Sequence, residues 1–111
     1  MSPSEIVTTQ IEAYNKRDLK GNMELFSENF QIIQFHDKFV LVDGKDACKK
    51  MYKDLFDNSP NLKAEIINRI NYGNIIILHE VIYGRYGQKE GLDQLIMFEI
   101  VENKIERIYK F

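Results

Sequence analysis

The chain has 111 residues, of which 44% are hydrophobic and 29% charged, the proportions of one folded domain. Its 15 Lys and Arg against 17 Asp and Glu give a net charge of −2, which excludes the basic field that binds nucleic acids and anionic membranes. The single cysteine, Cys48, excludes an intrachain disulfide, and no Cys/His cluster has zinc-ligand spacing.

Targeting and cofactor motifs are also missing from the sequence. The first five residues contain no basic segment, and apolar runs such as Ile75–Leu78 are too short to cross a bilayer. No glycine-rich nucleotide loop or nucleophile-elbow motif occurs. We therefore expect a cytoplasmic protein with no cofactor and no bound metal, which binds neither nucleic acid nor membrane.

Two helix starts occur near the N-terminus. Ser2 and Glu5 have the spacing of a capping box, and apolar residues then recur at helical spacing as far as Tyr14. Asp18 is a second N-cap residue, and it predicts a short helix that extends to Phe26.

A strand and a third helix follow. Phe30–His36 carries residues that favour β-structure. The segment Asp43–Asp46 starts a helix whose apolar stripe runs through Ala47–Phe56, the clearest helical periodicity in the chain. Pro60 ends this helix, because proline cannot continue the helical hydrogen-bond ladder.

The second half of the chain has β character. Leu62–Tyr72 and Ile75–Gly84 form a predicted hairpin, Arg85–Gly91 is a polar loop, and Leu92–Val101 and Lys104–Phe111 form a second hairpin. Helices followed by an antiparallel meander predict an α+β fold in which the helices pack on one face of a bent sheet. We expect residues 1–111 to form a single domain.

Three motifs, taken in this order, carry a family resemblance: Ala13–Leu19 between the first and second helices, Gly44–Ala47 at the start of the third, and Phe98–Ile105 in the last hairpin. They are similar to motifs of the NTF2-like superfamily, which includes the SnoaL-like proteins and the ketosteroid isomerases. The resemblance covers nearly the whole chain. It implies a cone in which three N-terminal helices pack on a curved, mostly antiparallel sheet, with an apolar ligand inside the cone and, in some members, enzymatic activity.

The catalytic residues of the ketosteroid isomerases do not carry over to this sequence. Those enzymes use a carboxylate base together with a tyrosine and a protonated aspartate as hydrogen-bond donors. The corresponding positions hold Gln34 for the base, Gln10 for the tyrosine and Ile96 for the aspartate, with Asp93 nearby in sequence. Because an amide cannot take up a proton at neutral pH, we expect no steroid isomerase activity.

Strand alternation leads to a predicted pocket. We expect the faces that carry aromatic residues to point into the cone, so that His79 and Tyr83 share the inner face of one strand. His79 is the preferred acid–base residue, because the pKa of free imidazole lies closest to neutral. Core packing or a surface position is the alternative for each residue. The other predicted pocket residues are Tyr14, Gln34, His36, Tyr83, Phe98, Arg107 and Tyr109.

The opposite faces of the late strands are apolar as well, although the helices can cover only one face. An exposed apolar patch of this kind predicts a homodimer through the convex sheet face, unless the C-terminal segment or loop 85–91 covers it. We expect this patch to comprise Ile76, Leu78, Ile82, Leu95, Met97 and Val101, with Glu80 and Glu99 at polar points.

Two functions are consistent with these patterns. One is a domain that binds a small apolar or amphipathic ligand. Such a domain either only binds the ligand or is an enzyme of the isomerase, cyclase or hydratase kind. The other is a non-catalytic domain for oligomerisation or for binding a protein partner. A deep cavity with polar groups favours the first function, and a cone filled by its own side chains favours the second.

Overall fold

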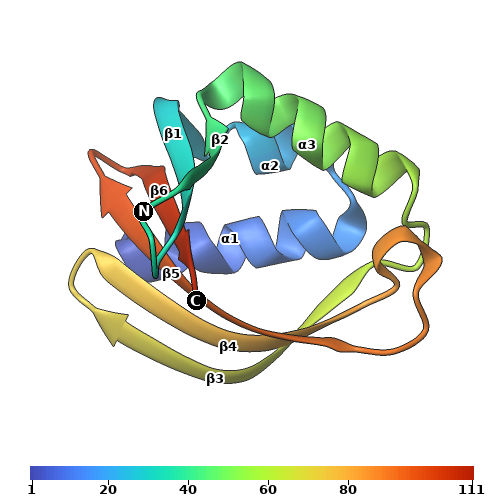
Figure 1. Cartoon of the computed structure of the whole chain (residues 1–111). Coiled ribbons are helices and arrows are strands. Elements are labelled where there is room, and N and C mark those ends of the chain that lie inside the picture. The colour runs from blue at the N-terminus through green and yellow to red at the C-terminus, as the bar shows by residue number, and fades with distance from the viewer.

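The computed structural model describes all 111 residues as three helices over one sheet (Figure 1). A short 3₁₀ turn, η1 (Arg85–Gly87), follows the fourth strand. The helices are α1 (Pro3–Lys16), α2 (Leu19–Met23) and α3 (Lys45–Asp57). The strands are β1 (Phe26–Gln34), β2 (Val40–Asp43), β3 (Lys63–Tyr72), β4 (Ile75–Tyr83), β5 (Leu92–Val101) and β6 (Lys104–Lys110).

The six strands form one sheet in the order β2-β1-β6-β5-β4-β3. Only the pair β1–β6 is parallel, and the other four pairs are antiparallel. Figure 1 shows β3 and β4 curving beneath α1, with α3 above. The predicted α+β cone, with three helices on a curved and mostly antiparallel sheet, is therefore confirmed.

Side-chain caps define the starts of the first two helices, as the sequence predicts. The Ser2 hydroxyl accepts the Glu5 N–H at 3.1 Å, while the Glu5 carboxylate accepts the Ser2 N–H at 3.0 Å. The Asp18 carboxylate accepts the Gly21 N–H at 3.0 Å and starts α2. These bonds satisfy N–H groups that the helices themselves leave free.

Two boundaries differ from the prediction. The helix α2 ends at Met23, and Phe26 begins β1, where it pairs with Ile105 of β6. This pairing joins the two ends of the chain, so local periodicity cannot indicate it. The short strand β2 was not predicted either, and it pairs only with β1 at the edge of the sheet.

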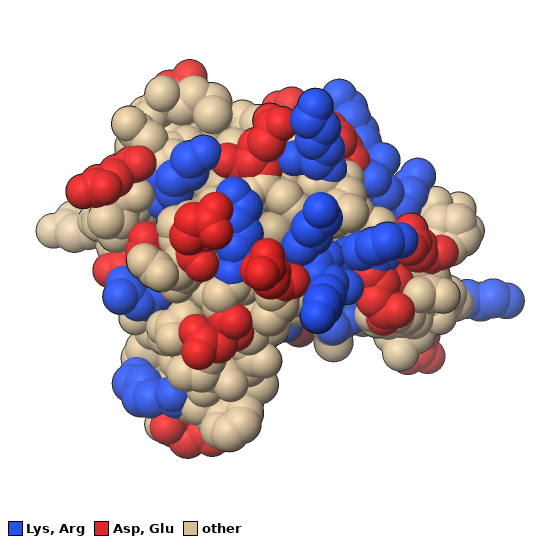
Figure 2. All heavy atoms as spheres, turned by 90° about the horizontal axis from the view of Figure 1, so that it is seen from above, with Lys and Arg blue, Asp and Glu red and all other residues tan.

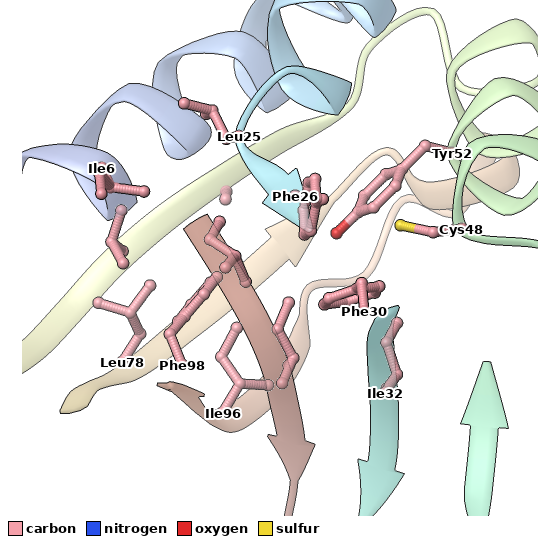
Figure 3. Close-up of a cluster of buried hydrophobic side chains, with 14 of the residues drawn as sticks. Ile6, Leu25, Phe26, Phe30, Ile32, Cys48, Tyr52, Leu78, Ile96 and Phe98 are labelled. Atoms are coloured by element: carbon pink, nitrogen blue, oxygen red, sulfur yellow. The ribbon is translucent and has the colours of Figure 1, made fainter. Parts of the chain in front are cut away.

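A continuous apolar core lies between the helices and the concave face of the sheet (Figure 3). Ile6 of α1 is fully buried, and Phe98 of β5 is 1% exposed. The rings of Phe26 and Phe30 meet edge to face at 4.6 Å, and Tyr52 of α3 lies 5.6 Å from Phe26. Burial of these aromatic groups supplies much of the favourable free energy of folding.

The predicted inner face of β4 is wrong. The buried residues of this strand are Ile76, Leu78, Glu80 and Ile82. His79 and Tyr83 therefore lie on the outer face, and Glu80 lies inside. The predicted exposed patch is also wrong for Ile76, Leu78, Ile82 and Glu80, which lie in the core. Both faces of β4 are apolar, so alternation alone defines two sets of residues without showing which set the helices cover.

The predicted inner face of β6 is wrong in part. Glu99 pairs with Arg107, but Ile100 pairs with Ile105, so β6 carries one extra residue at this point. This bulge places both Ile105 and Ile108 in the core and turns Arg107 and Tyr109 outward. Simple alternation, which groups Ile105 with Arg107, fails at a bulge.

The Phe26 ring offers a test of this core. Replacing Phe26 by alanine should lower the free energy of unfolding by roughly 3–5 kcal/mol, because it leaves a cavity beneath α3. Tyr72, which is 79% exposed, provides the matched control, and Tyr72→Ala should change stability by less than about 0.5 kcal/mol. Urea unfolding of both variants measures the difference, and equal losses would contradict the assigned core.

Candidate functional site

One pocket lies between α1, α3 and the inner face of the sheet, with a cavity volume of about 80 Å³. Twelve of its 17 lining residues are hydrophobic. The hydrophobic ones are Ile11, Tyr14, Ile32, Met51, Tyr52, Leu55, Ala64, Ile82, Tyr86, Ile96, Phe98 and Ile108, and the other five are Gln10, Glu80, Arg85, Gln94 and Lys110.

Two tyrosines line the pocket from the helices. Tyr14 of α1 packs edge to face against Tyr52, at 6.4 Å, and against Phe56, at 5.8 Å, both on α3. Burial raises the pKa of Tyr14 and that of Tyr52, so both phenols remain protonated at neutral pH. They can therefore act as hydrogen-bond donors toward a ligand, but not as bases.

The sheet contributes three polar side chains at one end of the pocket. Glu80 of β4 lies opposite Gln94 of β5, and the Gln94 amide donates a hydrogen bond of 3.0 Å to its carboxylate. Two residues further along β5, Ile96 lies opposite Lys110 of β6. Glu80, Gln94 and Lys110 thus come from three neighbouring strands and share the inner face.

Burial shifts the acid–base behaviour of two of these groups. It raises the pKa of Glu80 above the ordinary value of 4.5, although the Gln94 hydrogen bond and the charge of Lys110 oppose the change. It lowers the pKa of Lys110 below 10.5, and the positive charge of Arg85 acts in the same direction. Both shifts have the sign expected when a charge is moved out of water.

The loop after β4 carries Arg85 and Tyr86 to the pocket, beside the C-terminal end of α3 (Figure 1). The Tyr86 hydroxyl donates to the Asp54 carboxylate of α3, and its backbone N–H donates to the Ser59 hydroxyl, both at 2.8 Å. Gly84, at φ 75°, allows the chain to turn, since a Cβ there would lie 2.3 Å from the Asn61 carbonyl oxygen. The loop is therefore anchored to α3 and to the segment that follows it.

Gln10 occupies the inward face of α1 at the other side of the pocket. Its amide nitrogen donates to the Asn22 side-chain oxygen at 3.0 Å, and Asn22 is fully buried. The position that corresponds to the isomerase tyrosine therefore holds a neutral amide that is already hydrogen-bonded.

The structure brings two of the predicted site residues, Tyr14 and Phe98, to the pocket wall. His79 lies on the outer face of β4, where its Nε2 atom is 2.7 Å from the Asp93 carboxylate of β5. Asp93 is itself exposed and does not enter the pocket. The outward position of His79 results from the inverted face of β4 described above.

The other predicted residues also lie away from the pocket. Arg107 pairs with Glu99 on the outer face, and the Tyr109 ring lies 6.4 Å from Phe35. Tyr83 is 39% exposed at the end of β4. Gln34 ends β1, and His36 follows in the turn before β2, with its ring 6.3 Å from that of Phe35.

The polar lining residues Glu80, Arg85, Gln94 and Lys110 were not predicted as site residues. One signal was present for Glu80, because a single carboxylate within the apolar run Ile75–Tyr83 is unusual in a strand. Lys110 and Arg85 carry no comparable signal, since charged residues near a strand end or in a loop are ordinarily solvated.

Outside the pocket, function could also depend on surface charge, on a metal-ligand cluster or on a membrane-spanning helix. Figure 2 shows Lys and Arg side chains interleaved with Asp and Glu on the face seen from above, so this face has no field of one sign. The structure contains no group of three or more His, Cys, Asp or Glu arranged to hold a metal ion. None of its helices combines the length and the apolar character needed to span a membrane.

The SnoaL-like domain family matches residues 7–108, which is nearly the whole chain. The chain belongs to this family. The NTF2-like resemblance predicted from the sequence is therefore confirmed. Among curated proteins, none matches the chain in sequence.

Solved structures share the fold of this SnoaL-like domain at low sequence identity. An uncharacterised cystatin-fold protein of Novosphingobium aromaticivorans has a TM-score of 0.90 and 20% identity, with 100% of this chain and 98% of that chain covered. A candidate polyketide cyclase of Sinorhizobium meliloti has a TM-score of 0.78 and 16% identity, with 96% of this chain and 94% of that chain covered. A Catenulispora acidiphila protein with a ketosteroid-isomerase-like fold, solved in complex with trimethylamine, has a TM-score of 0.73 and 14% identity, with 96% of this chain and 84% of that chain covered.

The buried carboxyl group of Glu80 makes stability depend on pH. A raised pKa in the folded state adds stability below pH 4.5, and this contribution is lost as the pH rises through the folded-state pKa. Glu80→Gln should remove this loss, so the variant should gain stability relative to the wild type as the pH rises from about 4 to about 7.

Urea unfolding at several pH values measures this difference. The matched control is Glu65→Gln, which replaces an exposed carboxylate of β3 and should follow the wild-type pH profile. A Glu80→Gln profile parallel to that of the wild type would show that Glu80 is solvated and would contradict its place in the pocket.

Proposed function

We propose that this SnoaL-like domain binds a small amphipathic ligand in the pocket between α1, α3 and the sheet. The observation that carries the proposal is the composition of that pocket, an apolar wall with Glu80, Gln94 and Lys110 converging at one end. An apolar cavity with a few converging polar groups is the usual form of a small-molecule site.

The size of the cavity limits the ligand. Its volume of about 80 Å³ is well below the roughly 300–1,000 Å³ of pockets that hold drug-sized molecules. A molecule with several fused rings would require the loop after β4 to move. A short chain or a single ring fits the proposal better, and the related protein from Catenulispora acidiphila was solved with a ligand as small as trimethylamine.

Glu80 is the group best suited to proton transfer, if the ligand is also a substrate. A general acid–base group works best when its pKa lies near the working pH, and burial moves the pKa of Glu80 in that direction. Isomerase, cyclase and hydratase reactions all need such a group, and one structural relative is a candidate polyketide cyclase. Steroid isomerase activity is not expected, since Gln10, Gln34 and Ile96 occupy the corresponding positions.

Filling the cavity tests the binding proposal. Ile96→Phe should abolish binding of benzyl alcohol, used as an amphipathic probe, because the larger ring occupies the pocket at a folding cost of roughly 1–3 kcal/mol. The control Leu41→Phe lies on the exposed strand β2 and should bind as the wild type does. Two-dimensional amide NMR measures binding and folding together. If benzyl alcohol shifts the amide signals of the wild-type protein only at residues outside the pocket, the proposal is wrong.

We also propose a homodimer through the outer face of the sheet. Helices cover only the inner face, and the outer face of β4 and β5 carries Ile75, Ile77, Val81, Leu95, Met97 and Val101. Leu95 is 39% exposed and Val101 37%. An apolar sheet face of this kind is rarely left in water by a soluble protein. The His79–Asp93 hydrogen bond and the Arg107–Glu99 ion pair lie on the same face and would give the contact polar points.

Leu95→Asp tests the dimer, because a buried carboxylate without a partner opposes association. Light scattering should give twice the chain mass of 13.1 kDa for the wild type and a single chain mass for the variant. Leu41→Asp places the same charge on β2 and should remain dimeric. A wild-type protein that stays monomeric at micromolar concentration would overturn this proposal.

A further inference from the structure

Arg85 and Lys110 line the pocket without an ionic partner in the protein. No Asp, Glu or terminal carboxylate lies within 4.0 Å of either cation, since the ion pairs of the structure join other residues. Neither side chain makes a hydrogen bond within the protein. A cation that lines an apolar pocket without a partner lacks much of the stabilisation that water or a carboxylate would give it.

The two cations belong to the same end of the pocket. Lys110 shares the inner face with Glu80 and Gln94, and Arg85 follows the end of β4, five residues after Glu80. Burial lowers the pKa of Lys110, the positive charge of Arg85 adds to this lowering, and the carboxylate of Glu80 opposes it. Glu80 is the only carboxylate among the lining residues, and its oxygen accepts a hydrogen bond from Gln94.

We propose that the pocket recognises an anionic ligand, a monocarboxylate with a small apolar body, whose carboxylate binds between Arg85 and Lys110. This inference rests on the ligand binding proposed above and adds the charge of the ligand to it. The apolar body then contacts the wall formed by residues such as Phe98 and Ile108.

Electrostatics favours this arrangement. The pocket lining holds two cations and one carboxyl group, which leaves an excess of positive charge. A ligand anion would balance this charge in surroundings where charge interactions are stronger than in water. Lysine and arginine form their strongest hydrogen bonds with carboxylates. Because burial favours the neutral form of Glu80, this group repels an incoming anion less than an exposed glutamate would.

The loop that carries Arg85 is held in place through the neighbouring Tyr86. Tyr86 is bonded to Asp54 through its hydroxyl and to Ser59 through its backbone N–H. Gly84 and Tyr86 both adopt positive φ angles, 75° and 51°. This anchoring reduces the entropy that Arg85 loses when it binds a ligand.

The experiment compares acids with their neutral amides, using butyrate with butyramide and benzoate with benzamide. Amide NMR titration of the full chain should show the acid binding at least about tenfold more tightly than its amide, with shifts at pocket residues. Lys110→Met and Arg85→Met should each remove most of this preference, because they lower the affinity for the acid more than the affinity for the amide. Lys63→Met and Lys89→Met, which remove exposed charges on β3 and on the same loop, should keep it.

The possible results separate this inference from the proposed function. If the amide binds in the pocket as tightly as the acid, the charge inference is wrong and the binding proposal stands. If the preference for the acid survives in Lys110→Met and in Arg85→Met, the anion binds elsewhere and the inference is wrong. If neither acid nor amide shifts pocket residues, both proposals fail. Circular dichroism of each variant confirms that the fold is retained.

Discussion

Because α1 and α3 cover a single face of the sheet, they determine which side chains of β4 and β5 lie in the core. Because strand residues alternate, this one contact sends Ile76, Leu78 and Ile82 into the core and takes Glu80 in with them. The core thus contains a carboxyl group, 4% exposed, with one hydrogen bond from Gln94. The polar end of the pocket and the apolar outer face of the sheet are two consequences of the same contact.

Burying Glu80 is unfavourable for folding, and the structure reduces this cost without removing it. Gln94 supplies one hydrogen bond, and Lys110 supplies a positive charge that is itself removed from water. Arg85 then adds a second cation from a loop anchored through Tyr86 to α3. A polar cluster that is only partly satisfied within the protein is the arrangement in which a ligand has most to contribute. The same polar cluster therefore underlies both the proposed ligand site and the proposed preference for an anion.

The sequence predicted the helices and the family because their signals are local, such as the capping box of Ser2 and Glu5. It placed Tyr14 on an inward helix face for the same reason. It could not place His79, since both faces of β4 are apolar and only packing by distant helices distinguishes them. Arg107 was misplaced because a bulge in β6 breaks the alternation, and bulges depend on pairing with β5. The pocket cations come from a loop and a strand end, where sequence patterns carry little information.

The central claim is that β4 directs Glu80, and not His79, into the pocket. The most direct test is a pH titration of the glutamate side-chain carboxyl carbons by NMR, with the Glu80 signal assigned through Glu80→Gln. Burial predicts that Glu80 takes up its proton at a pH above the 4.5 of an ordinary glutamate. If Glu80 titrates with a midpoint at or below 4.5, in the same range as the exposed carboxyl groups, its side chain lies in water and the account is contradicted.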